Sequence, residues 1–250
     1  MLMNLPWSDL VIIFSSIAIA YIIFGIAGFG TALIASPVLA NFIPISYIVP
    51  LLALMDLFAA LSNIVKDGKK ADILELKRLI PLMILGSLIG AAILLKTNAE
   101  ILLLALSIFV IGYSLYSLSG FKPNTKFNSN AAIPFGMTGG VFSALFGSGG
   151  FIYAIYLSGR IENKENMRIT QSTLIGFSTL TRVILFSIAG VYANGSILIL
   201  ALILSPAMLI GIFIGRNITL KLTREQFLRI INLIVLLSGV FLLIRYFNHL

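Results

Sequence analysis

The chain has 250 residues, of which 59% are hydrophobic and only 10% charged, and its mean hydropathy is +1.08. A soluble domain carries about 25% charged residues, so this composition excludes a water-soluble enzyme. The net charge of +8 comes mainly from Lys and Arg between apolar runs, which is typical of membrane-protein loops rather than of a nucleic-acid-binding surface.

Ten apolar stretches follow one another along the chain. They cover residues 10–27, 31–43, 46–65, 79–95, 101–118, 131–146, 150–158, 169–192, 197–215 and 230–247. A transmembrane helix needs about 20 apolar residues, so the chain provides for roughly 8 to 10 membrane segments. The stretches predict an all-α polytopic membrane protein.

A polar segment at 119–130 divides the chain into two halves of similar length. The spacing of four residues in the first half recurs 125 residues later, matching Pro81, Gly86, Gly90 and Glu100 with Pro206, Gly211, Gly215 and Glu225. A second match, over 119 residues, aligns Gly28 with Gly147, Gly30 with Gly149 and Asn63 with Arg182. These matches indicate internal duplication. We expect a first transmembrane repeat at 1–118, a linker loop at 119–130 and a second repeat at 131–250.

The distribution of basic residues predicts that the two repeats are inverted in the bilayer. If 10–43 and 131–158 each crossed once, the sixteen Lys and Arg outside the apolar segments would divide equally between the two faces. If Gly-rich breaks near Gly28 and Gly147 fold these segments back, fourteen share one face. The excess of Lys and Arg in cytoplasmic loops favours the folded-back arrangement. Each repeat is then a Gly-broken helical hairpin plus three transmembrane helices.

The second part of each hairpin has to be short. Segment 150–158 rises only about 14 Å as a helix, whereas the hydrocarbon core is about 30 Å thick. This predicts a re-entrant or half-depth helix there. Whether each Gly-rich hairpin crosses fully or only dips to mid-depth stays open at the level of sequence.

The two breaks are candidate anion sites. Irregular backbone at membrane depth is tolerated where protein buries it or where it lines a watery cavity, and the N-terminus of a helix attracts anions. Two inverted copies would bring both breaks together near the midplane. The alternative is that the glycines only permit close helix packing. The predicted substrate-binding residues at the breaks are Gly28, Gly30, Gly147, Ser148, Gly149 and Gly150.

Two ionisable residues lie deep inside apolar stretches, where such residues mark transport pathways by default. Arg182 offers a fixed fork of donors that suits an oxyanion, and Gln171 and Ser178 share its helix face, as Asn63 shares the face of Asp56. We predict that Arg182, Gln171, Ser178 and Asn63 bind substrate. Asp56 is the candidate for coupling transport to a proton. A structural ion pair between Asp56 and Arg182 is the alternative, and the two roles are compatible.

Several chemistries are excluded by residue types. The chain has no cysteine, and its one histidine, His249, is the penultimate residue. Thiolate and clustered-His metal sites and a His-based triad are therefore unavailable. No mid-membrane carboxylate pair and no hydrolase or metalloprotease motif supports an intramembrane enzyme. The sequence thus predicts no enzyme, no metal and no cofactor.

The chain resembles the sulfite exporter TauE/SafE family, also called the 4-toluene sulfonate uptake permease family. The resemblance spans the whole length and rests on two copies that each open with a Gly-rich segment, GIAGFGTALIASPVL at 25–39 and FGSGGFIYAIYL at 146–157. The basic loop at 66–78 fits as well, as does the S-T-L stretch that begins at Ser172. The second copy departs from the pattern, because Tyr156 stands where Pro37 would match.

The resemblance implies transport of a small sulfur-containing anion such as sulfite or an organosulfonate across the bacterial inner membrane. We expect a secondary transporter or permease that works in the export direction, because an inside-negative potential drives an anion outward. A passive anion channel, or a transporter of another small carboxylate or oxyanion, is the alternative. The expected partners are the small anion and the lipid bilayer, with no nucleic acid, and a homo-oligomer stays possible.

Overall fold

The computed structural model describes residues 6–27, 30–67, 71–120, 126–193, 195–217 and 224–248. Within them lie ten α-helices: α1 (Trp7–Ala27), α2 (Thr31–Leu39), α3 (Ile45–Asp67), α4 (Ile73–Lys96), α5 (Ala99–Leu118), α6 (Ala132–Phe146), α7 (Gly150–Ser158), α8 (Lys164–Ile188), α9 (Ser196–Asn217) and α10 (Arg224–Asn248). A short 3-10 turn, η3 (Ser129–Ala131), precedes α6. Each apolar stretch identified in the sequence coincides with one of these helices, so the all-α prediction is confirmed.

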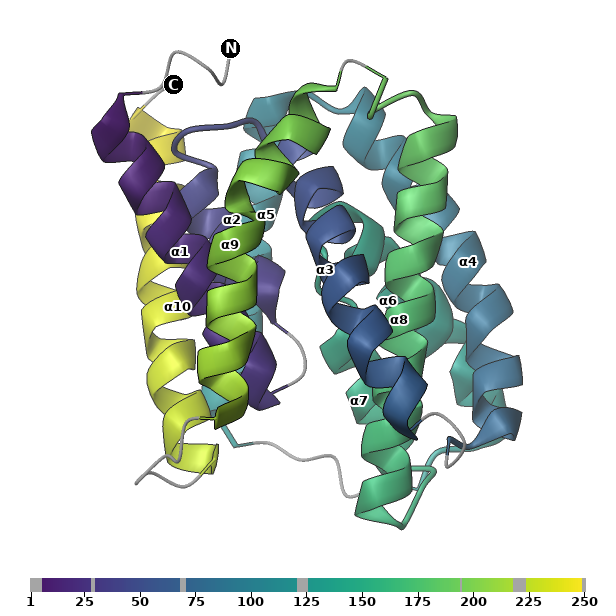
Figure 1. The fold of residues 1–250 in the computed structure, drawn as a ribbon. Coiled ribbons are helices and arrows are strands. Elements are labelled where there is room, and N and C mark those ends of the chain that lie inside the picture. Colours follow the sequence, from purple (N-terminus) through teal and green to yellow (C-terminus); the bar gives the residue numbers. More distant parts are fainter. Residues whose placement is uncertain are drawn as a thin grey trace. The chain divides into compact units, whose positions relative to one another are not determined.

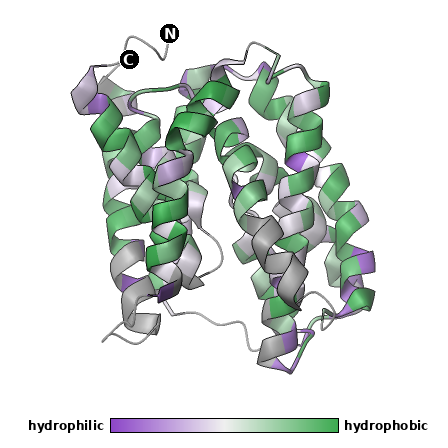
Figure 2. Cartoon of the chain, in the orientation of Figure 1, coloured by the Kyte–Doolittle hydropathy of each residue, from purple (hydrophilic) through white to green (hydrophobic). Residues whose placement is uncertain are grey.

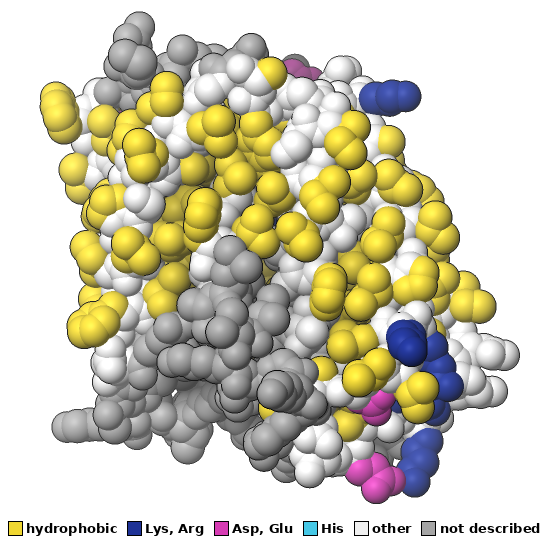
Figure 3. Space-filling view, turned by 45° about the vertical axis from the view of Figure 1, so that its right-hand side comes forward, with side chains coloured by type: hydrophobic (Ala, Val, Ile, Leu, Met, Phe, Trp, Pro, Cys, Tyr) yellow, Lys and Arg dark blue, Asp and Glu magenta, His cyan; other side chains and the backbone are white. Residues whose placement is uncertain are grey.

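Five helices in the described part of the chain are long and apolar enough to cross a membrane. These stretches are Trp7–Gly25, Ile73–Lys96, Ala99–Leu118, Ile169–Ile188 and Ser196–Gly215. Hydrophobic residues dominate the helices in Figure 2, and on the face shown in Figure 3 they cover a broad band with Lys and Arg gathered at its lower edge. Such an apolar exterior suits lipid rather than water, which identifies a multi-pass membrane protein.

The chain forms two compact units that do not coincide with the two predicted repeats. Unit 1 comprises residues 1–48, 97–122 and 206–250, and unit 2 comprises residues 49–96 and 123–205. Each unit therefore combines helices from the first half of the chain with helices from the second half. The division into repeats stays a prediction.

Unit 1 contains two helix pairs made from opposite halves of the chain (Figure 1). In one pair, α5 packs against α10. In the other, α9 lies against α1, where a Cβ on Gly211 would come within 2.5 Å of the carbonyl oxygen of Ala18. A Cβ on Gly215 would collide with the carbonyl oxygen of Ile22. Only glycine permits backbones to approach this closely, so these two glycines hold α9 on α1.

Unit 2 contains the same kind of contact between α4 and α6 (Figure 1). A Cβ on Gly86 would collide with the carbonyl oxygen of Met137, and one on Gly90 would lie 2.5 Å from that of Val141. The small face of α6 contributes Gly140 to the same seam. Within the same unit, α8 packs on α4, and the short α7 packs on α6 and α8.

The segment formed by α6 and α7 folds back on itself, as the Gly-rich break predicts. Gly147 has a φ of 68° and ends α6, a backbone conformation that glycine adopts at little cost. The two ends of the hairpin then meet, because the backbone N–H of Phe127 donates to the carbonyl of Gly159. With nine residues, α7 rises about 14 Å and is too short to span the hydrocarbon core.

The first hairpin is built in the same way. Gly30, with a φ of 98°, precedes the nine-residue α2, which packs against α1. The sequence predicts an apolar segment that continues to residue 43, but α2 ends at Leu39 and a turn follows before Pro44. Asn41 closes this end, since its side-chain amide donates to the carbonyls of Pro37 and Val38.

Arg78 and Arg160 of unit 2 lie at the same end of α4, while Arg182 lies deep inside α8. Arg78 is in the first turns of α4, and both it and Arg160 contact Glu75. Arg160 also donates to the carbonyl of Phe127, the neighbour of Lys126. Lys96 lies at the opposite end of the 24-residue α4. Within this unit, Lys96 therefore lies at the opposite end of α4 from Arg78 and Arg160. The basic loops and Lys96 are also expected on opposite faces from the sequence.

Candidate functional site

The buried guanidinium of Arg182 is the centre of the candidate site. Arg182 lies inside α8 with only 2% of its surface exposed. Its Nη2 donates to the hydroxyl oxygen of Thr179 at 3.1 Å and lies 3.8 Å from Oδ2 of Asp56 on α3. Asp56 is itself 6% exposed. The structure thus brings together the two deeply placed ionisable residues that the sequence singles out.

Hydroxyl groups continue the polar path from Arg182 toward the start of α7. Ser178 lies one helical turn before Arg182, and its Oγ is 2.6 Å from the Oγ of Ser143 on α6. Ser143 in turn borders the break between α6 and α7, since a Cβ on Gly149 would lie 2.8 Å from the Cβ of Ser143. Gly149, Ser178 and Arg182 therefore belong to one connected group of residues, with Ser143 as the link.

The backbone at the break is tightly packed. Gly147 donates its N–H to the carbonyl of Ser143, and the buried Ser148 donates its hydroxyl to the carbonyl of Phe146. A Cβ on Gly149 would also collide with the carbonyl of Gly139. These residues place the positive N-terminal end of the α7 dipole beside Ser143.

Gln171 contacts the same break from α8. Its Nε2 donates to the carbonyl oxygen of Gly150 at 3.2 Å. Eleven residues separate Gln171 from Arg182, which corresponds to about 16 Å along a helix. Gln171 and Arg182 thus mark two levels of α8, with Ser178 between them.

For three of the predicted residues, membership of this group stays a prediction. Gly30 belongs to unit 1, where a Cβ on it would meet no atom within 4 Å. Gly28 and the side chain of Asn63 lie outside the described residues. The predicted meeting of the two Gly-rich breaks stays a prediction.

Most other hydroxyls of α8 are used by the helix itself. Thr173 and Thr181 donate to carbonyls four residues earlier, a common way of satisfying a hydroxyl in an apolar helix. Ser178 differs because its hydroxyl bonds across to another helix. The hydroxyl of Ser178 thus contacts α6, whereas those of Thr173 and Thr181 bond within α8.

Two tyrosines lie close to Arg182. The hydroxyl of Tyr192, after the end of α8, donates to the carbonyl of Pro50 at 3.0 Å. Burial raises the pKa of Tyr192 above its usual range, and the positive charge of Arg182 opposes that rise. Tyr153 on α7 is fully buried, with its hydroxyl beside Ser178 and within range of the charge of Arg182.

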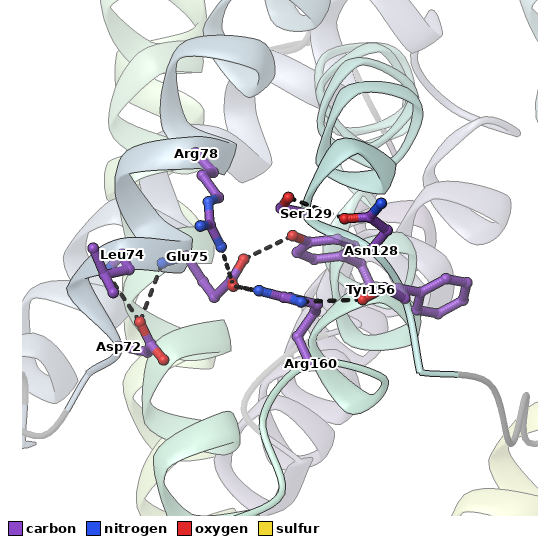
Figure 4. A network of polar contacts seen from close by, with 9 residues as sticks. Asp72, Leu74, Glu75, Arg78, Asn128, Ser129, Tyr156 and Arg160 are labelled. Carbon is purple, nitrogen blue, oxygen red and sulfur yellow. Dashed lines mark hydrogen bonds and ion pairs between the residues drawn. The ribbon is translucent and has the colours of Figure 1, made fainter.

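A carboxylate fixes the far end of α7 (Figure 4). Glu75 is 4% exposed, and its Oε2 accepts a 2.7 Å hydrogen bond from the hydroxyl of Tyr156. Its Oε1 accepts from Nε and Nη2 of Arg160 and from Nη1 of Arg78. Charge-assisted bonds of this kind are strong. The cluster joins α4 to α7 and to the turn before α8.

The start of α4 positions this carboxylate. Asp72 precedes α4, and its Oδ1 accepts hydrogen bonds from the backbone N–H groups of Leu74 and Glu75. This is the side-chain cap that stabilises helix N-termini. The hydrogen bond to Glu75 also raises the pKa of Arg160, so Arg160 stays charged throughout the physiological range.

Unit 1 contains an open pocket of about 380 Å³ that holds none of the predicted site residues. It lies beyond the C-terminal end of α2, and Glu100 and Tyr246 contribute to its wall together with the turn at 40–45. Among the described residues, no group of three His, Asp or Glu side chains could hold a metal ion.

Sequence reasoning missed Ser143 and Tyr153. Ser143 shares a helix face with Gly136 and Gly140. A face of small residues indicates contact with another helix, and this pattern was the available signal for Ser143. Nothing in the sequence separates Tyr153 from Tyr156, one turn later on α7. Only the structure shows that their hydroxyls have different surroundings.

Comparison with known proteins gives one match. A family described as "Sulfite exporter TauE/SafE" matches residues 13–242 of the chain. No curated protein and no solved structure matches the chain.

Proposed function

The chain belongs to the sulfite exporter TauE/SafE family and is therefore a membrane transporter, and we propose that it moves a small oxyanion bound at Arg182 across the bacterial inner membrane. Sulfite or an organosulfonate fits the family best. The observation that carries the proposal is the guanidinium of Arg182, 2% exposed inside α8. An ionised side chain so placed is costly, and functional use is the usual reason that it is kept.

The surroundings of Arg182 suit an anion with several oxygens. A guanidinium presents its donors in a plane and matches oxyanions with two bonds at once. The neighbouring hydroxyls of Ser178 and Ser143 can donate as well as accept, and the N-terminal end of α7 adds a positive dipole near Ser143. All of these groups favour negative charge on the ligand.

Asp56 gives the site a coupling group. Its carboxylate lies 3.8 Å from the guanidinium, so an anion at Arg182 competes with Asp56 for the same positive charge. A proton on Asp56 removes this competition and would travel with the anion. Export needs no such coupling, since the membrane potential contributes about 2.3 kcal/mol per charge per 100 mV to an anion that leaves the cell.

Binding to purified protein tests the proposal. Ligands that bind the native state raise its thermal stability, so sulfite, methanesulfonate, sulfate and acetate are screened by unfolding in detergent. We expect stabilisation by sulfite or methanesulfonate. In Arg182→Ala the affinity should fall at least about 100-fold, equivalent to about 2.7 kcal/mol, and Arg182→Lys should recover little of it because a lysine cannot bind two oxygens in the guanidinium geometry. Equal affinity in the folded alanine variant would remove Arg182 from the site.

Flux measurements separate the transporter from a passive channel. In proteoliposomes, a transporter loaded with unlabelled anion on one side should accelerate the movement of labelled anion from the other side. A channel passes current and shows no such exchange. Absence of stimulation together with an anion current would contradict the carrier mechanism while leaving the binding site in place.

A further inference from the structure

Tyr153 on α7 is a buried residue next to the proposed site. We propose that the hydroxyl of Tyr153 donates a hydrogen bond to the anion held at Arg182, and is thus a substrate-binding residue on α7. The inference rests on the proposed function of the Arg182 site, and it assigns a role to a residue that sequence reasoning did not select.

The first observation is an unsatisfied hydroxyl. Tyr153 has 0% of its surface exposed, and within the described part of the chain its Oη meets no partner at full hydrogen-bond geometry, although the hydroxyl of Ser178 lies near it. Buried tyrosine hydroxyls usually have a partner. A buried donor without a partner destabilises the folded protein, which indicates a functional role for a hydroxyl at this position.

The second observation is the position of that hydroxyl. It lies beside Ser178 and within range of the positive charge of Arg182. Ser178 is already engaged with Ser143 at 2.6 Å. A buried donor without a full partner therefore lies within the electrostatic reach of the guanidinium. An oxygen of an anion bound there would supply the acceptor that this donor lacks.

Packing holds the tyrosine in place. A Cβ on Gly139 of α6 would collide with the ring of Tyr153, so the ring fills the space that this glycine leaves. The ring also belongs to a core cluster with Leu79, Met83 and Leu174. A donor fixed in this way loses little conformational freedom when it binds a ligand.

The neighbouring tyrosine gives a matched contrast. Tyr156 lies on the same helix, is equally buried, and donates its hydroxyl to Glu75 at 2.7 Å. Its hydroxyl is accounted for by the structure, whereas that of Tyr153 is not. Removing each hydroxyl should therefore have opposite effects on the stability of the protein without ligand.

The test compares Tyr153→Phe with Tyr156→Phe in purified full-length protein, using sulfite and methanesulfonate as separate probes. In Tyr153→Phe we expect the thermal midpoint without anion to be equal to or higher than in the wild type. The dissociation constant of the bound anion should rise 10- to 100-fold, because a hydrogen bond to a charged group is lost. In Tyr156→Phe the midpoint should fall while the dissociation constant stays within about threefold.

Each other outcome contradicts the inference. Unchanged affinity in Tyr153→Phe shows that the hydroxyl does not contact the anion. A Tyr153→Phe protein that is destabilised or fails to fold shows that the hydroxyl has a structural partner instead. If the wild type binds neither probe nor any other oxyanion, the proposed function fails and this inference fails with it. Wild-type binding with unchanged affinity in the variant overturns the inference alone.

Discussion

The two compact units share one packing solution but differ in the chemistry placed beside it. In unit 1, Gly211 and Gly215 of α9 press against the carbonyls of Ala18 and Ile22 on α1. In unit 2, two glycines of α4 do the same on α6, where Gly86 and Gly90 meet Met137 and Val141. Gly211 and Gly215 follow Gly86 and Gly90 by 125 residues in the sequence, and the residues that they contact are offset by 119 residues. These are the same two offsets at which the sequence motifs repeat.

At three positions the second half of the chain carries a hydroxyl where the first half carries an apolar side chain. Over the 119-residue match, Ser143, Tyr153 and Ser178 correspond to Phe24, Ile34 and Ala59. The framework is repeated, while the hydroxyl groups around Arg182 belong to the second half of the chain. This supports the duplication as a proposal, and it suggests that one half came to carry the anion chemistry.

The largest effect is expected from the shared glycine contact. In Gly86→Val, the new side chain would collide with the backbone of Met137, and overpacking costs typically about 1–3 kcal/mol and occasionally more. We expect a strong loss of thermal stability or no folded protein in detergent. Gly112→Ala on α5 is the matched control, because a Cβ there meets nothing within 4 Å and alanine favours the helix. Equal behaviour of the two variants would contradict the close contact.

The next effect concerns the anchor of α7. Glu75→Gln removes the charge that two arginines and Tyr156 contact. We expect a loss of about 2–3 kcal/mol, somewhat below the cost of breaking a fully buried pair because Arg78 and Arg160 are partly exposed. Thermal unfolding measures it. Glu162→Gln, which breaks an exposed pair with Lys126, should leave the midpoint unchanged.

Asp56→Asn tests whether the carboxylate of Asp56 competes with the anion for Arg182. Because the carboxylate no longer competes for Arg182, anion affinity at neutral pH should rise about tenfold, or about 1.4 kcal/mol. In the wild type, binding should strengthen as pH falls, since protonation of Asp56 removes its negative charge, and the variant should lack this dependence. Retained pH dependence of binding and transport in the variant would exclude Asp56 as the coupling group.

The smallest effect is expected at the edge of the site. Tyr192→Phe removes a hydrogen bond to the carbonyl of Pro50, which is worth about 1 kcal/mol. The thermal midpoint should fall slightly. A large loss of anion affinity would instead mean that Tyr192 belongs to the site, and the site would then extend beyond the group described.

Sequence reasoning reached the helices and the deep ionisable residues because both follow from local composition. An apolar run predicts a helix by itself, and a lone Arg182 in such a run is conspicuous. It missed the contacts of Ser143 and Tyr153, since these depend on which helices pack together. It also missed the Glu75 cluster, because Glu75 lies next to a basic loop and only tertiary packing brings Arg160 and Tyr156 to it.

Direct localisation of the bound anion tests the central claim most sharply. Selenite is a heavier relative of sulfite, and its selenium can be located by anomalous scattering in crystals of the unmodified protein. We predict a selenium peak within about 4 Å of the Arg182 guanidinium, because a charge-assisted N···O hydrogen bond of about 2.7–2.9 Å places the selenium one Se–O bond further away. No such peak is expected in Arg182→Ala. A peak in the pocket beside Glu100, with none at Arg182, would contradict the account.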